Sequence, residues 1–144
     1  MSQQNLEMVR LANEALNRGD IEEVLSYYAE DAEFEDLMNA PDLPQVVRGI
    51  EEVRQVLMAW AQAFDEFRAE IAEYIDLEEH VVCVTDYFGR SREGVTIRLR
   101  TGNVVELRDG KIARVTVGYP SREDALEAVG MPEQGVQRST AKPE

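Results

Sequence analysis

Residues 30–37 read EDAEFEDL, and this stretch decides how the fold of the chain is interpreted. In a β-strand, successive side chains point to opposite faces, so Ala32, Phe34 and Asp36 share one face. Glu33 and Glu35 then take the other face. The first face is apolar until it ends in a carboxylate. That carboxylate either ends the strand in water or enters a pocket.

Helical periodicity lies on both sides of this strand. Residues 4–17 carry apolar side chains at helical spacing, Gly19 ends that helix, and Asp20 is expected to cap a second short helix. Residues 39–48, NAPDLPQVVR, are typical of a loop. From residue 50 to 64, apolar side chains recur at steps of three or four, which predicts a long helix with one apolar stripe. Such a stripe needs a flat partner.

The period changes from helix to strand after residue 67. Strands are expected at 69–77, 81–88, 95–107 and 112–119, with Asp109 and Gly110 forming a tight hairpin before the last one. Ser121 should cap a final short helix. Helices followed by consecutive antiparallel strands predict an α+β fold, with helices packed on a sheet.

The composition of the chain limits the number of domains and the kinds of binding partner. The 144 residues suit one domain, expected at residues 1–130, followed by a mobile tail at residues 131–144. The formal net charge of -14 has the wrong sign for nucleic acid or anionic membranes. No apolar run has the length of a membrane span, and the N-terminus lacks the pattern of a signal peptide, so we expect a cytoplasmic protein.

Few residues of the chain favour metal or cofactor chemistry. Cys83 lies in an apolar run, where a small buried side chain is the simplest interpretation. His80 is the sole histidine, so no histidine-based metal site is expected. The sequence has no glycine-rich phosphate loop and no CxxC pair, so no cofactor is implied.

Polar residues interrupt a second apolar face. In the strand at 95–107, Thr101 and Asn103 share the parity of Ile97, Leu99 and Val105. A buried polar group without a partner costs about 1–3 kcal/mol, so such exceptions need a reason. One alternative is that Asp36 caps a turn and that Asn103 lies in a bulge beside Gly102. The other is a polar spot inside an apolar pocket.

Several motifs together resemble a known family. They are EALNRGD at 14–20, YAEDAEFED at 28–36, RGIEEV at 48–53, LRDGKI at 107–112 and SREDALEAVG at 121–130. The chain, over about residues 3–130, resembles the SnoaL-like, ketosteroid-isomerase and polyketide-cyclase branch of the nuclear-transport-factor-2-like superfamily. The resemblance implies a cone of N-terminal helices and curved antiparallel sheet around an apolar pocket, usually in a homodimer.

The resemblance also implies roles for particular residues. In ketosteroid isomerase, an aspartate moves a proton beside a carbonyl while a tyrosine and a protonated aspartate hold the oxyanion. Asp36 matches the base, Ala12 stands at the tyrosine position, and Asn103 falls at the second donor. Of Tyr27, Tyr28, Tyr87 and Tyr119, we expect Tyr119 to replace the missing donor because it shares parity with Val115 and Val117.

These roles lead to one expected function and its rivals. We expect a cofactor-independent acid–base enzyme, of isomerase or cyclase type, acting on a small apolar carbonyl compound. Phe34, Trp60, Tyr28, Thr101, Val105 and Val117 would form the pocket. The alternative is a binding module or dimeric interaction module without chemistry. Epoxide hydration ranks lower because Gly118 stands where a carboxylate is expected, which leaves Glu73 as the candidate.

Overall fold

The computed structural model describes residues 2–38 and 44–130. The expected tail at 131–144 and the first half of the expected loop, 39–43, lie outside them. The helices are α1 (Ser2–Arg18), α2 (Ile21–Ser26), α3 (Ile50–Ala63) and α4 (Arg122–Ala128). The strands are β1 (Tyr28–Asp36), β2 (Val46–Arg48), β3 (Phe64–Leu77), β4 (His80–Ser91), β5 (Thr96–Arg108) and β6 (Lys111–Tyr119).

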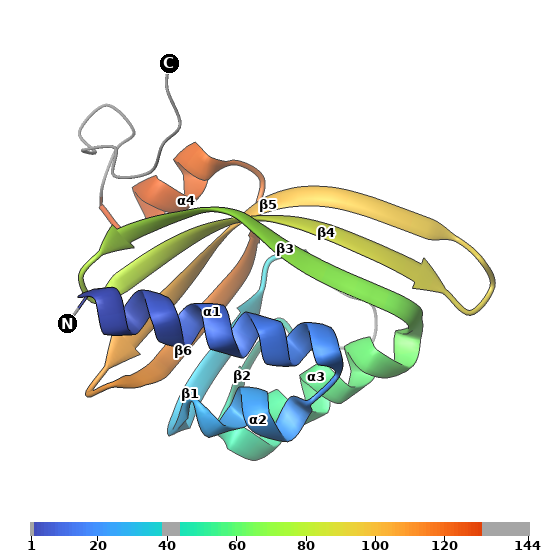
Figure 1. The fold of residues 1–144 in the computed structure, drawn as a ribbon, viewed down its shortest axis with the longest axis horizontal. Coiled ribbons are helices and arrows are strands. Elements are labelled where there is room, and N and C mark those ends of the chain that lie inside the picture. Colours follow the sequence, from blue (N-terminus) through green and yellow to red (C-terminus); the bar gives the residue numbers. More distant parts are fainter. Residues whose placement is uncertain (1, 39–43, 131–144) are drawn as a thin grey trace.

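The strands form one curved six-stranded sheet in the order β2-β1-β6-β5-β4-β3 (Figure 1). All neighbouring pairs are antiparallel except β1 and β6, which are parallel. The sheet is therefore mixed, where the sequence predicted an antiparallel one. Hairpins connect β3 to β4, β4 to β5 and β5 to β6. In contrast, β1 pairs with β6 although most of the chain lies between them in the sequence. That pairing places Phe34 opposite Val115 and Asp36 opposite Val117.

The helices cover both faces of the sheet. Helices α1, α2 and α3 lie against the concave side, which we call the inner face, and α4 lies on the outer face (Figure 1). The main core fills the space between the inner face and the first three helices. A second core lies between α4 and the outer face, and it consists of Ile75, Val82, Val104, Ala125 and Leu126. The N-terminal helices thus pack on the sheet as expected.

Local signals in the sequence fix most element ends. The Asp20 side chain accepts a hydrogen bond from Glu23 N–H at 3.1 Å, and Ser121 caps Asp124 in the same way. Asp109 and Gly110 have φ of 54° and 76°, as a tight hairpin turn requires. These three predictions are confirmed.

The strands β3, β4 and β5 extend beyond the helices (Figure 1). Val95, Ile97 and Leu99, which we call the distal stripe, are 59%, 42% and 42% exposed. The sequence placed them on an apolar inward face, and their burial was predicted wrongly. Their parity is regular, but no helix among the described residues covers this end of the sheet.

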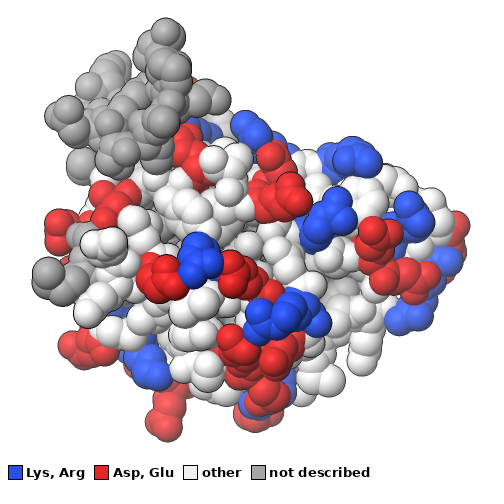
Figure 2. All heavy atoms as spheres, in the orientation of Figure 1, with Lys and Arg blue, Asp and Glu red and all other residues white. Residues whose placement is uncertain are grey.

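Charged side chains are spread over the surface. Figure 2 shows acidic and basic groups interspersed on the displayed face. Several form exposed ion pairs, including Asp31 with Arg108 at 2.7 Å and Asp86 with Arg100 at 2.6 Å. Within the described residues, no helix has the length and apolarity needed to cross a membrane.

Candidate functional site

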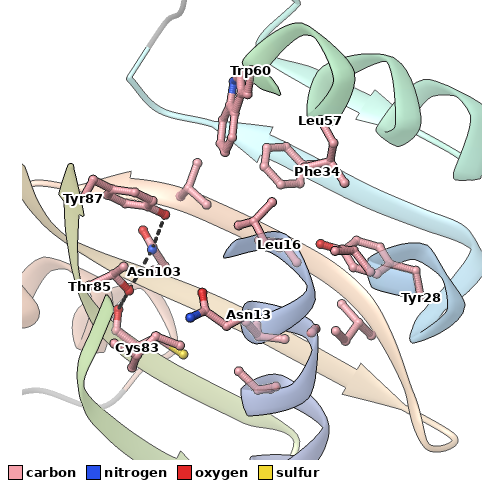
Figure 3. Close-up of a pocket in the computed structure, with 18 residues that line it drawn as sticks. Asn13, Leu16, Tyr28, Phe34, Leu57, Trp60, Cys83, Thr85, Tyr87 and Asn103 are labelled. Carbon is pink, nitrogen blue, oxygen red and sulfur yellow. Dashed lines mark hydrogen bonds between the residues drawn. The ribbon is translucent and has the colours of Figure 1, made fainter. Parts of the chain in front are cut away.

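A cavity of about 90 Å³ lies between the inner face, α1 and α3 (Figure 3). Of the residues expected in the pocket, five line it: Tyr28, Phe34, Trp60, Val105 and Val117. Every described residue that lines the cavity has an uncharged side chain. The cavity is therefore suited to a neutral, mainly apolar molecule.

A row of aromatic rings lies along the cavity, of which Phe34, Trp60 and Tyr87 line it and Phe67 does not. Phe34 meets Trp60 edge to face with ring centroids 5.6 Å apart, and Trp60 lies 6.3 Å from Phe67. Phe67 in turn lies 6.0 Å from Tyr87. These separations fall in the range that stabilises aromatic pairs. The row of rings runs from β1 across α3 to β3 and β4, and it ends at the Tyr87 phenol.

A β-bulge in β6 shapes the polar end of the cavity. Gly102 pairs with Tyr119 and Val104 pairs with Thr116, so Val117 and Gly118 together face the single residue Asn103. Gly118 has φ of +102°, a conformation that favours glycine. Its N–H donates to the Asn103 side-chain Oδ1 at 3.0 Å. The bulge thus directs a backbone donor towards a side chain.

Asn103 uses its whole hydrogen-bonding capacity inside the protein. Its Oδ1 also accepts from the Thr101 hydroxyl at 3.0 Å. Its Nδ2 donates to Thr85 Oγ1 at 3.2 Å and to the Tyr87 hydroxyl oxygen at 2.9 Å. Asn103 lines the cavity, but both of its amide hydrogens are engaged. Thr101 does not line the cavity and acts on it through Asn103.

The Tyr87 hydroxyl presents a hydrogen to the polar end of the cavity. Its oxygen accepts from Asn103, and among the described residues its own O–H donates to no protein acceptor. Burial raises the pKa of Tyr87, opposed by the hydrogen bond from Asn103 and reinforced by the charge of Asp36. The phenol therefore keeps its proton at neutral pH. A neutral phenol at this position is a hydrogen-bond donor for a carbonyl oxygen.

Tyr119, the tyrosine favoured by the sequence, lies on the other face of the sheet. It packs against the second core, beneath α4, and it does not line the cavity. The extra residue of the bulge at Val117 and Gly118 reverses the alternation, so Tyr119 no longer shares a face with Val117. Strand parity pointed to Tyr119, and nothing in the sequence pattern singled out Tyr87.

Asp36 is buried on the inner face at the end of β1, and it is 4% exposed. Its Oδ1 accepts from the Met38 N–H at 2.8 Å, which is the turn-capping contact of the first alternative. It does not line the cavity, although its strand partner Val117 does. Asp36 is close enough for its charge to add to the raised pKa of Tyr87.

Glu73 is separated from Asp36 by the sheet. A register shift between Ile71 and Glu73 reverses the alternation of β3, so Ile71 lines the cavity and Glu73 faces α4. There it makes two hydrogen bonds with Arg122, at 3.0 and 3.2 Å. Glu73 is therefore not the second carboxylate that epoxide hydration would require beside Asp36. In the part of the chain that is described, no group of His, Cys, Asp or Glu could hold a metal ion.

Solved structures share this architecture. TerC, crystallised with polyporic acid, is 23% identical, with a TM-score of 0.73 over 81% of this chain and 91% of its own. A Burkholderia pseudomallei NTF2-like protein of unknown function is 21% identical, with a TM-score of 0.74 over 90% and 97%. A Catenulispora acidiphila protein with a ketosteroid-isomerase-like fold, in complex with trimethylamine, is 16% identical, with a TM-score of 0.70 over 89% and 95%. These likenesses show a common fold.

Sequence comparison gives the family. A search of curated proteins finds no significant match. The family model described as a SnoaL-like domain matches residues 9–115, from the middle of α1 to the middle of β6. That span contains most of the curved sheet and the helices that enclose the cavity. The chain therefore belongs to the SnoaL-like family.

Proposed function

We propose that the protein binds a small, neutral, mainly apolar molecule in the cavity between the inner face and α1. The observation that carries this proposal is the uncharged lining, with the Tyr87 hydroxyl at its polar end. One structural neighbour was co-crystallised with polyporic acid and another is in complex with trimethylamine, which supports a small-molecule role for such a pocket. The family contains both enzymes and ligand-binding proteins, so the chemistry of this site has to come from its own residues.

The size of the cavity limits the ligand. Its volume is about 90 Å³. An apolar cavity of about 150 Å³ is large enough for benzene. This cavity is smaller than that, so we expect a correspondingly small ligand, and a larger one would require α1 and α3 to move away from the sheet.

Methyl NMR tests the binding site directly. The probe is cyclobutanone, a compact ring with one carbonyl oxygen, titrated into protein labelled at valine and leucine methyl groups. We expect saturable shifts at Val105 and Val117, which line the cavity. Val82 and Leu126 belong to the second core on the outer face and serve as internal controls. Shifts that fail to saturate, or that are as large at the second core, would contradict the proposal.

Acid–base catalysis is the second candidate, and the burial of Asp36 on the same face favours it. Because Asp36 does not line the cavity, its side chain would have to turn away from the Met38 N–H and reach past Val117. Its carboxylate would then take a proton from the carbon beside a carbonyl while the Tyr87 hydroxyl hydrogen-bonds the enolate oxygen. The protonated Asp36 exchanges its proton with water, and delivery of a proton to the same or a neighbouring carbon restores the carboxylate and gives the starting compound or its isomer. The step needs no cofactor, because one proton is taken and one is returned.

Hydrogen–deuterium exchange distinguishes the two candidates. An acid–base enzyme would exchange the hydrogens beside the carbonyl of cyclobutanone for deuterium in D₂O faster than buffer does. Asp36→Asn should abolish that exchange and keep the binding shifts. Glu35→Gln is the matched control, because Glu35 points away from the inner face and pairs with Arg114. Exchange that persists in Asp36→Asn, or that never exceeds the buffer rate, leaves only the binding function.

The homodimer implied by the family resemblance stays a prediction. Sedimentation velocity of the purified chain measures it directly, with a single species of twice the chain mass expected.

A further inference from the structure

We infer that the polar end of the cavity only donates hydrogen bonds to a ligand, and we call it a one-way donor. Gly118 fixes the orientation of the Asn103 amide, Asn103 fixes that of the Tyr87 hydroxyl, and the Tyr87 O–H donates to the ligand. It follows that the ligand must bring a hydrogen-bond acceptor, such as a carbonyl oxygen, to this end. This inference rests on the proposed function, because it specifies which neutral molecules the cavity prefers. Asn103 is then a positioning residue, and Tyr87 is the residue that touches the ligand.

The donor-to-acceptor direction of this hydrogen-bond chain is fixed at the backbone of β6. A peptide N–H can only donate, so the atom of Asn103 that lies 3.0 Å from Gly118 N must be the amide oxygen. The amide oxygen and nitrogen are hard to distinguish by shape alone, but this contact settles which is which. The Thr101 hydroxyl adds a second donor to the same oxygen, at 3.0 Å. The Asn103 NH₂ group must then face β4.

On β4 the Asn103 amide meets two hydroxyl oxygens. The Thr85 hydroxyl accepts at 3.2 Å, and its own hydrogen goes to the Cys83 carbonyl oxygen at 3.2 Å, within the same strand. The Tyr87 hydroxyl accepts the other amide hydrogen at 2.9 Å. Since Tyr87 already accepts on this side, its hydrogen is left to point towards the cavity. Each donor in such a chain polarises the next, which strengthens the last donor.

The opposite end of the cavity has no such chain. Figure 3 shows the Tyr28 hydroxyl pointing inward from β1, on the far side from Tyr87 and Asn103. Within the described residues no hydrogen bond fixes its direction, so its O–H can rotate to donate or to accept. Tyr28 also stays protonated, because burial raises its pKa. The two phenols therefore differ in direction and not in charge, which makes Tyr28 a matched control for Tyr87.

Three probes of similar size test the direction. Cyclobutanone carries an acceptor, methylenecyclobutane has the same shape without one, and pyrrole carries an N–H donor. Affinities come from the methyl shifts of Val105 and Val117, which line the cavity. One net hydrogen bond gives about 0.5–1.5 kcal/mol, so we expect cyclobutanone to bind about 2- to 13-fold more tightly than methylenecyclobutane, and pyrrole to gain nothing from the Tyr87 end. Tyr87→Phe should remove the preference, and Tyr28→Phe should keep it.

The outcomes separate this inference from the proposed function. If none of the three probes gives saturable shifts, the binding function itself fails. If all three bind equally, or if pyrrole binds best even in Tyr28→Phe, the cavity stands and the one-way donor is overturned. A preference that survives in Tyr87→Phe would also overturn it, because the donor would then be another group.

Asn103→Asp tests the positioning role through pH. An ionised carboxylate only accepts, so it would draw the Tyr87 hydrogen to itself and remove the donor from the cavity. A protonated carboxyl group can donate to Tyr87 as the amide does. The preference for cyclobutanone should therefore be lost in this variant at neutral pH and return in acid, while the original protein shows the same preference at both. A purely structural role would weaken all three probes alike at every pH. If the variant does not fold, the comparison of Tyr87→Phe with Tyr28→Phe still tests the one-way donor.

Discussion

Gly118 donates its backbone N–H to Asn103 Oδ1 at 3.0 Å across a β-bulge, and this contact ties the path of β6 to the polar end of the cavity. A regular strand would direct that N–H into the sheet ladder or into solvent. The side-chain amide takes the place of the missing strand partner. Backbone geometry and site chemistry therefore depend on the same glycine.

Gly118→Ala should destabilise the protein. An added Cβ would lie 2.7 Å from Met38 Cγ and 3.1 Å from Met38 N, in a backbone conformation with φ of +102°. We expect a loss of about 1–3 kcal/mol in the free energy of unfolding. Urea unfolding measures it. Gly110→Ala is the control, since its φ is also positive, +76°, but an added Cβ meets nothing within 4 Å. Equal losses in the two variants would show that the contact with Met38 has no cost.

Asn103→Leu should be more damaging than the removal of an exposed amide. The substitution takes away the acceptor of Gly118 N–H and of the Thr101 hydroxyl, and each buried group left without a partner costs about 1–3 kcal/mol. Asn5→Leu is the control, because Asn5 makes one exposed hydrogen bond to the Glu78 carbonyl oxygen. Thermal unfolding should show a clear drop in Tm for Asn103→Leu and little change for Asn5→Leu. A similar Tm for both variants would argue that the network adds nothing to stability.

Stability should fall in alkali, beginning near pH 9. Burial raises the pKa of the Cys83 thiol from 9.0 to about 12, and burial also raises the pKa of Tyr74 from 10.0 to about 12. The folded protein keeps these protons when the unfolded chain has lost them. The stabilisation is therefore complete below pH 9 and is lost as the pH rises towards 12. Urea unfolding between neutral and alkaline pH measures this slope. Cys83→Ala should make the first part of the fall shallower, and an unchanged slope would contradict that assignment.

The pair of Glu73 and Arg122 should couple β3 to α4. Their side chains are 11% and 17% exposed, and they share two hydrogen bonds. A largely buried ion pair is screened less than an exposed one, so its two charges attract each other more strongly. A double-mutant cycle with Glu73→Gln and Arg122→Gln should give a coupling energy of about 1–3 kcal/mol.

The exposed pair of Asp31 and Arg108 is the control for that cycle. It spans 2.7 Å, and its side chains are 54% and 52% exposed. Exposed pairs of this kind couple by about 0–1 kcal/mol. A coupling between Glu73 and Arg122 that is no larger than this would mean that the pair does not hold α4 in place.

The sequence predicted the elements well because periodicity reports burial. The stripe from Ile50 to Trp60 identified α3, and the alternation around Phe34 identified β1. The polar spot was also visible, since Thr101 and Asn103 interrupt an apolar parity and the structure joins them by a hydrogen bond.

Two of the errors in the site share one physical cause. Alternation assigns faces only while a strand is regular, and a bulge reverses the assignment beyond it. Tyr119 lies beyond the bulge at Gly118, and Glu73 lies beyond the register shift after Ile71. Both therefore face α4, although parity favoured Tyr119 for the pocket and Glu73 was the candidate for a second carboxylate. The sheet order posed a different problem, because the parallel contact of β1 with β6 joins segments that are distant in sequence.

Two opposing forces act between copies of the molecule at the distal stripe. Val95, Ile97 and Leu99 offer water an apolar surface, while the formal net charge of -14 makes copies of the molecule repel one another. Repulsion between exposed charges is screened beyond about 8 Å at physiological ionic strength, whereas apolar attraction is not screened by salt. Dilute buffer should therefore keep the molecules well dispersed. Added sodium chloride should increase light scattering, and Leu99→Lys should suppress that increase.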